Sequence, residues 1–145
     1  MADLLRVEDL HIEFRVHGGI VQAVKGASFR IRPGSTVALV GESGSGKSVI
    51  SQAIMGILPN TASITGGKIL FNDPDRPGEV IDIAALQTRD EDMRAIRGGR
   101  ISIIFQDAMT SLSALHTIGD QIGEALHLHR DVGRAEGRQM VETML

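Results

Sequence analysis

An octapeptide at residues 41–48, GESGSGKS, narrows the possible folds of this chain more than any other part of it. It fits the pattern G-x-x-x-x-G-K-[ST] at every fixed position. The residues before it, 36–40, are apolar on both faces, as a buried parallel strand requires. After it, apolar residues recur at helical spacing over 49–58 until Pro59 stops them. A strand, a glycine-rich loop and a helix in this order predict an α/β core that binds phosphate.

The residue types of the octapeptide suit phosphate chemistry. Glycines adopt backbone angles that other residues resist, so successive N–H groups can turn inward around a phosphate, and the following helix adds its positive N-terminal end. Lys47 brings a cation to the β and γ phosphates, and the Ser48 hydroxyl can ligate Mg²⁺. The alternative is a connector that matches the pattern by chance, expected in about one per cent or fewer of chains of this length. The expected nucleotide-binding residues of this segment are Gly41, Ser43, Gly44, Ser45, Gly46, Lys47, Ser48 and Val49.

Composition excludes several other classes of function. The 145 residues are 42% hydrophobic and 23% charged, as in an ordinary globular domain. With 15 basic and 18 acidic residues, a net charge of −3 and only 3% aromatic residues, the chain is not expected to bind nucleic acid. It has no cysteine, hence no disulfide or thiolate metal site. Asp3 stands where a signal peptide needs basic residues, and the uncharged stretch 48–67 is interrupted by Gly56 and Pro59, so neither export nor a membrane span is expected.

The remaining segments show the periodicities of strands and helices. Apolar residues alternate with polar ones over 10–14, and β-forming residues continue across Gly18 and Gly19 to Val24, which predicts an antiparallel hairpin. Glu91 three residues after Thr88 forms a candidate capping box for a short helix. Further strands are expected at 27–31, 68–71 and 100–105, a loop at 72–79, and helices from Thr88 to Gly98, from Thr117 and from Arg134 onward.

Two later blocks carry a resemblance to a known family. Residues 103–112 read IIFQDAMTSL and residues 116–122 read HTIGDQI. Together with GESGSGKSV at 41–49, they closely resemble the ATP-binding subunits of ABC transporters, nearest the dipeptide and oligopeptide importer group. The resemblance runs from about Leu4 to the last residue, and the block at 103–112 is far more specific than the phosphate loop alone.

The resemblance implies a fold and further site residues. The implied fold is α/β: a partial P-loop NTPase core with an N-terminal antiparallel β subdomain at 1–105, and the Q-loop with the start of a truncated helical subdomain at 106–145. Gln106 is similar to the Q-loop glutamine, which in the family contacts Mg²⁺ and the attacking water. A polar strand terminus is the alternative for this residue. Phe14 stands where the family places an aromatic that stacks on adenine, although an inward-facing strand Phe is nearly as good an interpretation.

The sequence also departs from the family. Ala108 replaces a usual Pro, and Ser113-Ala114 replaces a common Asn-Pro. No segment resembles the LSGGQ signature, the Walker B acid with its catalytic glutamate, or the histidine switch; the nearest string to the signature, ITGGK at 64–68, leads into a strand instead of a helix. We therefore expect an N-terminal portion of the subunit that lacks ATP hydrolysis by itself.

The function implied by the resemblance is ATP binding, with Mg²⁺, in an importer for peptides or a related solute. Implied partners are transmembrane permease subunits and a second ATP-binding subunit, so the chain is expected to be peripheral at the cytoplasmic face of the inner membrane and to reach the membrane through its partners only.

Two alternatives stay open. One is an inactive truncated nucleotide-binding or interaction module. The other is a GTP-binding switch, for which 75–78 and 120–123 fit D-x-x-G but no Asn-Lys-x-Asp follows.

Weaker candidates are explained better by ordinary structure. His127 and His129 are two residues apart, so on a helix they point in different directions and make a poor metal pair. Arg94, Arg97 and Arg100 are expected on a solvated face.

Overall fold

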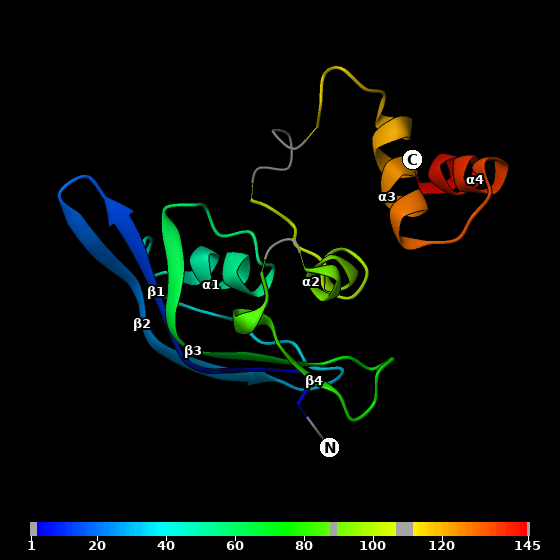
Figure 1. The fold of residues 1–145 in the computed structure, drawn as a ribbon. Coiled ribbons are helices and arrows are strands. Elements are labelled where there is room, and N and C mark those ends of the chain that lie inside the picture. The colour runs from blue at the N-terminus through cyan, green and yellow to red at the C-terminus, as the bar shows by residue number, and fades with distance from the viewer. Residues whose placement is uncertain (1–2, 88–89, 107–111, 145) are drawn as a thin grey trace. The chain divides into compact units, whose positions relative to one another are not determined.

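The chain divides into two compact units, Met1–Arg100 and Ile101–Leu145. The computed structural model describes residues 3–87, 90–106 and 112–144 (Figure 1). The division falls after Arg100, ahead of the domain boundary expected after residue 105, and that assignment of domains stays a prediction.

The first unit is built on a four-stranded antiparallel sheet in the order β2-β1-β3-β4 (Figure 1). The predicted hairpin is confirmed, because Val16 pairs with Gly19 and the two strands run antiparallel from there. β3 is longer than the expected strand at 68–71, and β4 follows the expected loop. The strands are β1 Leu5–Val16, β2 Gly19–Ile31, β3 Ala62–Asn72 and β4 Val80–Asp82.

One face of this sheet is buried and forms the core. Leu5 and Val7 point into it while Arg6 between them is exposed, as the alternation of a strand requires. A bulge between Val7 and Leu10 restores the inward direction, so that Leu10 and Ile12 are also fully buried. The hydrophobic pattern of the N-terminal segment therefore fixes which face of the sheet receives the helices.

Short helices cover the buried face. α1 (Lys47–Ile54) contacts β2 and the 3₁₀ turn η1 (Ile83–Ala85), and it buries Ile50 and Ala53 (Figure 1). α2 (Glu91–Ile96) begins after Asp90, in agreement with the expected short helix. The candidate capping box at Thr88 lies outside the described residues.

Two segments expected to be strands are not strands. Residues 36–40 have no regular secondary structure, and Val37, Leu39 and Val40 are 43%, 40% and 92% exposed. The strand expected at 100–105 is also absent, because only Ile101 forms an isolated bridge and residues 102–105 have no regular secondary structure. A parallel strand exists only when a neighbouring strand takes up its N–H and C=O groups. No strand of the described residues pairs with either segment, and the apolar pattern alone cannot replace that partner.

The second unit contains the two helices predicted for it, α3 (Ile118–His129) and α4 (Arg134–Met144). Thr117 caps α3 as expected: its Oγ1 accepts a hydrogen bond from the backbone N–H of Asp120 at 3.1 Å and donates one to Asp120 Oδ2 at 2.7 Å. Leu126 and Val141 are the buried apolar residues of the two helices. In the described part of the chain, no helix has the length and apolar character needed to cross a membrane.

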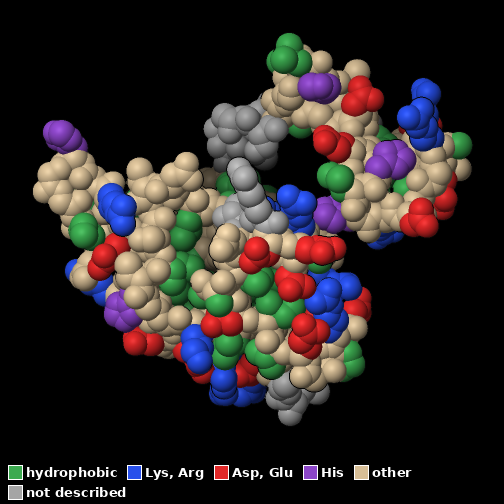
Figure 2. All heavy atoms as spheres, in the orientation of Figure 1, with side chains coloured by type: hydrophobic (Ala, Val, Ile, Leu, Met, Phe, Trp, Pro, Cys, Tyr) green, Lys and Arg blue, Asp and Glu red, His purple; other side chains and the backbone are tan. Residues whose placement is uncertain are grey.

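Acidic and basic side chains are interspersed over the face of the first unit that Figure 2 shows. Arg100 pairs with the buried Asp73 at 3.3 Å and also with Asp75. Arg76 donates to Asp92 Oδ1 at 3.0 Å, and this hydrogen bond is the main reason that the pKa of Arg76 is raised above its ordinary value. These pairs join the loop after β3 to α2 and the residues just beyond it.

Candidate functional site

The glycine-rich loop ends at Gly46, which immediately precedes α1. Gly46 has φ 89° and Gly44 has φ 81°, both in the left-handed region that favours glycine. A Cβ at Gly46 would lie 2.6 Å from the carbonyl oxygen of Ala23 in β2. The end of the loop is therefore packed directly on the backbone of the sheet, at a distance that only glycine allows.

The Lys47 ammonium lies inside the curve of the loop. Its Nζ donates to the carbonyl oxygens of Gly41 at 2.8 Å and Glu42 at 2.6 Å, and to Ser45 Oγ at 3.2 Å. These three acceptors match the three N–H donors of the side chain. A Cβ at Gly41 would come within 2.7 Å of Ser45 Oγ, so a side chain at residue 41 would force the Ser45 hydroxyl out of its position beside the ammonium.

The N-terminus of α1 offers donors for an anion. No side chain caps this end of the helix, and the first N–H groups of a helix have no partner within it. Ser48 lies exposed in the first turn, Val49 is half-buried, and Ile50 anchors the helix in the core. Open N–H groups, a helix dipole and one ammonium form a cradle that fits phosphate, and the exposed Ser48 hydroxyl fits a Mg²⁺ ligand.

Phe14 is half-buried in β1, where it pairs with Val21 and Ala62. It lies two residues beyond Ile12 and thus on the same face of the sheet. The cross-strand partner of Ile12 is Val24, whose Cγ2 would be 3.1 Å from a Cβ at Gly46. The phenyl ring and the end of the loop therefore share one sheet face.

Gln106 belongs to the second unit, where it is exposed. Residues 107–111, which carry much of the resemblance around it, lie outside the described residues. Gly41, Ser43, Gly44 and Ser45 are exposed residues of the loop in the first unit. The structure thus joins Lys47 to its loop, and the pairing of Gln106 with that loop stays a prediction.

Sequence reasoning missed Arg97, which supports the other end of α1. Its Nε donates to the carbonyl of Met55 at 3.0 Å, and its Nη2 donates to the carbonyl of Gly56 at 3.1 Å. α1 has no basic residue in its own last turn, so the cation at its negative end comes from a distant part of the chain. The expectation of a solvated face is wrong for Arg97, which is half-buried, whereas Arg94 and the ion-paired Arg100 are exposed as expected.

The two histidines lie in α3, near its C-terminal end. Among the described residues no group of three potential ligands is placed to hold a metal ion. Both histidines are exposed, and His127 packs against α4, where a Cβ at Gly137 would lie 3.2 Å from its Cε1.

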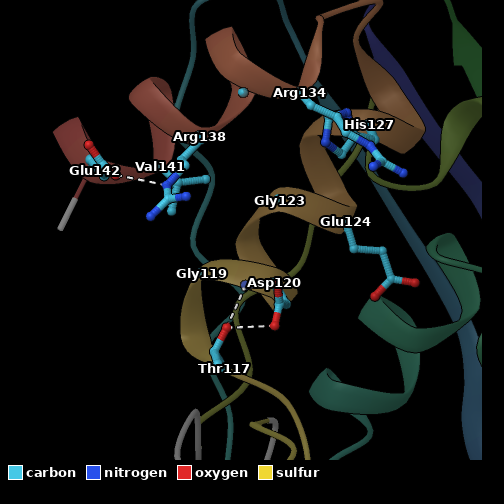
Figure 3. A pocket seen from close by; sticks show the side chains of 11 residues that line it. Thr117, Gly119, Asp120, Gly123, Glu124, His127, Arg134, Arg138, Val141 and Glu142 are labelled. Carbon is cyan, nitrogen blue, oxygen red and sulfur yellow. Dashed lines mark hydrogen bonds and ion pairs between the residues drawn. The ribbon is translucent and has the colours of Figure 1, made fainter.

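His127 also lines a groove of about 680 Å³ between α3 and α4 (Figure 3). Both acidic and basic side chains line this groove, and Arg138 pairs with Glu142 at 3.1 Å within it. This mixture of charges favours no single class of ligand.

Comparison with protein families agrees with the loop geometry. A family model described as ABC transporter matches residues 24–144, which is most of the chain. The chain belongs to the ABC transporter family. It is 47% identical over 146 residues to the dipeptide transport ATP-binding protein DppD of Bacillus subtilis, covering 100% of this chain and 41% of that protein. It is 40% identical to the oligopeptide transport ATP-binding protein OppD of Mycobacterium tuberculosis, covering 100% of this chain and 22% of that protein. The chain spans less than half the length of these two relatives.

Similarity to a solved ABC transporter structure confirms the fold class. The dimeric post-hydrolysis structure of the ATP-binding cassette MJ0796, bound to ADP and Pi, has a TM-score of 0.76 with 21% identity, covering 96% of this chain and 54% of that one. At this level of identity the likeness concerns the fold alone. The resemblance implied an α/β P-loop NTPase fold, and this prediction is confirmed. The four-stranded sheet of the first unit is its antiparallel β subdomain.

Proposed function

We propose that this chain carries the ATP- and Mg²⁺-binding part of an ATP-binding subunit of an ABC importer for peptides or a related solute. The observation that carries the proposal is the Lys47 ammonium held inside a glycine loop at the open N-terminus of α1. The peptide assignment is supported by relatives whose names describe dipeptide and oligopeptide transport.

In this proposal each site residue has a separate task. The loop amides and the first turn of α1 bind the phosphates, while Lys47 exchanges its bonds to the loop carbonyls for bonds to phosphate oxygens. Ser48 ligates Mg²⁺, and Gln106 contacts the metal and orients water. Phe14 stacks on the adenine from the sheet face next to the loop. In a transporter that also supplies the remaining catalytic groups, hydrolysis of the bound ATP would drive import.

Transport requires partners outside this chain. We propose transmembrane permease subunits and a second ATP-binding subunit, with the chain held at the cytoplasmic face of the inner membrane through the permease. The relatives named for transport support both proposals.

The binding proposal is tested by thermal unfolding with and without ATP and Mg²⁺. A ligand that binds only the folded state stabilises it by about 2.7 kcal/mol at a hundredfold excess over Kd. We expect ATP and Mg²⁺ to raise the unfolding temperature of the unsubstituted chain. Lys47→Ala should abolish this shift because the loop loses its cation. Lys25→Ala, which removes an exposed lysine of β2, serves as the control and keeps the shift. Equal shifts for Lys47→Ala and the original chain would refute the proposed site.

Hydrolysis is a separate question from binding. Phosphoryl transfer needs a positioned water and neutralised γ-phosphate charge, and the family supplies these partly from the Walker B glutamate, the histidine switch and the partner's signature helix. No segment of this sequence resembles those elements. We expect no ATP turnover above background in a steady-state phosphate-release assay. Turnover that disappears in Lys47→Ala would reveal a catalytic base among these residues.

A further inference from the structure

Three arginines gather on the solvent face of the sheet, opposite the core. Arg6 of β1 and Arg30 of β2 are direct cross-strand partners, and Arg32 follows just after the end of β2. Residues two apart at a strand end share a face, so the three side chains project from the same side. Lys and Arg side chains gather at the lower edge of the first unit in Figure 2, where the strands run in Figure 1.

This arrangement is unfavourable without an anion. Like charges directly opposite each other on a sheet destabilise it. Arg6 is paired with Glu8, its Nε lying 2.9 Å from Glu8 Oε1, but no described residue forms an ion pair with Arg30 or Arg32. Glu8 is also directly opposite Lys68, so its single carboxylate faces two cations. The acidic residues near the cluster do not balance it.

The arginines border a groove of about 630 Å³. Asp3 is the one carboxylate that lines it, and Leu70 and Val80 give it an apolar side. Asn72 also lines it, with its Nδ2 already donating to the carbonyl of Asp3 at 2.6 Å. Guanidinium groups present planar pairs of N–H donors that match phosphate oxygens, and a concave site suits a discrete molecule better than a flat membrane.

We propose that this groove binds a soluble phosphate-bearing small molecule, with Arg30 and Arg32 as its principal ligands and the apolar side receiving an organic group. The site is separate from the loop at Lys47, because it lies on the opposite face of the sheet from the one on which Gly46 packs.

The test uses the full 145-residue chain carrying Lys47→Ala, so that the phosphate loop does not contribute. Pyrophosphate titrated by calorimetry is expected to bind this variant with saturation. Adding Arg30→Gln is expected to weaken binding about tenfold, as the loss of one charged hydrogen-bonding group does. Arg15→Gln, which removes an exposed arginine at the far end of β1, is the control and leaves binding unchanged.

The Arg30→Gln variant is also expected to unfold, without ligand, at the same or a slightly higher temperature, since repulsion from Arg6 is relieved. Arg32→Gln provides a second variant and should weaken binding similarly. Absence of saturable pyrophosphate binding, or equal weakening by Arg15→Gln, would overturn the proposal. So would binding to vesicles containing phosphatidylglycerol without binding to pyrophosphate, because that result assigns the arginines to a membrane surface. Each of these outcomes is independent of ATP binding at Lys47.

Discussion

Gly46 combines a left-handed backbone with a close approach to β2. Gly46→Ala would cost about 1–2 kcal/mol for the left-handed conformation alone, and its Cβ, 2.6 Å from the oxygen of Ala23, would also push the loop from the sheet. Gly44→Ala is a matched comparison, because Gly44 is left-handed too but has open space around it. In urea unfolding we expect Gly46→Ala to be clearly the more destabilised variant. If the two variants lost the same free energy of unfolding, the contact between Gly46 and β2 would not support the loop.

The residues of the loop were predictable from sequence, whereas their supports were not. The motif specifies Lys47 and the glycines because phosphate binding needs those residue types next to one another in the chain. Phe14 was identified through a resemblance only, and the structure adds the shared sheet face that supports it. Arg97 carries no local signal, because its acceptors at Met55 and Gly56 are about forty residues earlier in the sequence.

Helix α1 depends on contacts at both of its ends. Arg97→Gln removes the guanidinium that satisfies the carbonyls of Met55 and Gly56, and hydrogen bonds from charged groups contribute about 1.5–3 kcal/mol. We expect Arg97→Gln to lower the free energy of urea unfolding by an amount of that order. Arg97→Lys should lower it less, because it keeps a cation that can donate to one of the carbonyls. Arg94→Gln removes an exposed arginine of α2, the helix that Arg97 directly follows, and should change stability by less than about 0.5 kcal/mol. A similar loss in both variants would mean that α2 tolerates no change on any face.

Elements with local patterns were predicted well. The β1–β2 hairpin, α1, α2, α3 and α4 appear where alternation, helical spacing and the Thr117 cap indicated them, but α1 ends at Ile54, earlier than the predicted stop at Pro59. Strands were expected at 36–40 and 100–105. Neither forms a strand, since a strand is defined by a partner that can be distant in the chain. β3 extends beyond 68–71 because pairing with β1 orders Ala62 and its neighbours, whose own sequence, with two adjacent glycines, predicts no strand.

For the whole molecule, exposed apolar residues predict self-association. Val40, Ile104 and Leu115 are each at least 90% exposed, and residues 36–40 also leave backbone groups available for pairing. We expect sedimentation velocity to show association that increases with concentration, and thermal unfolding to be broad. Val40→Lys should reduce association, because a charge in a segment with unpaired backbone groups opposes strand pairing with another chain. The control is Val16→Lys, which replaces another exposed apolar residue, in the paired hairpin, and should leave association unchanged.

A dilute monomer with a sharp cooperative transition would contradict this expectation. It would mean that residues 36–40 are satisfied by contacts other than strand pairing.

The exposed segment at 36–40 has another consequence, which concerns cleavage of the chain. It is the covalent connection between the β1–β2 hairpin and α1, yet the non-covalent connections are more extensive, since β3 pairs along β1 and Gly46 rests on β2. A protease that cuts at Val37 or Leu39 would find an accessible backbone there. The two fragments would then stay associated as a nicked complex, held by the sheet, and would separate only in denaturant.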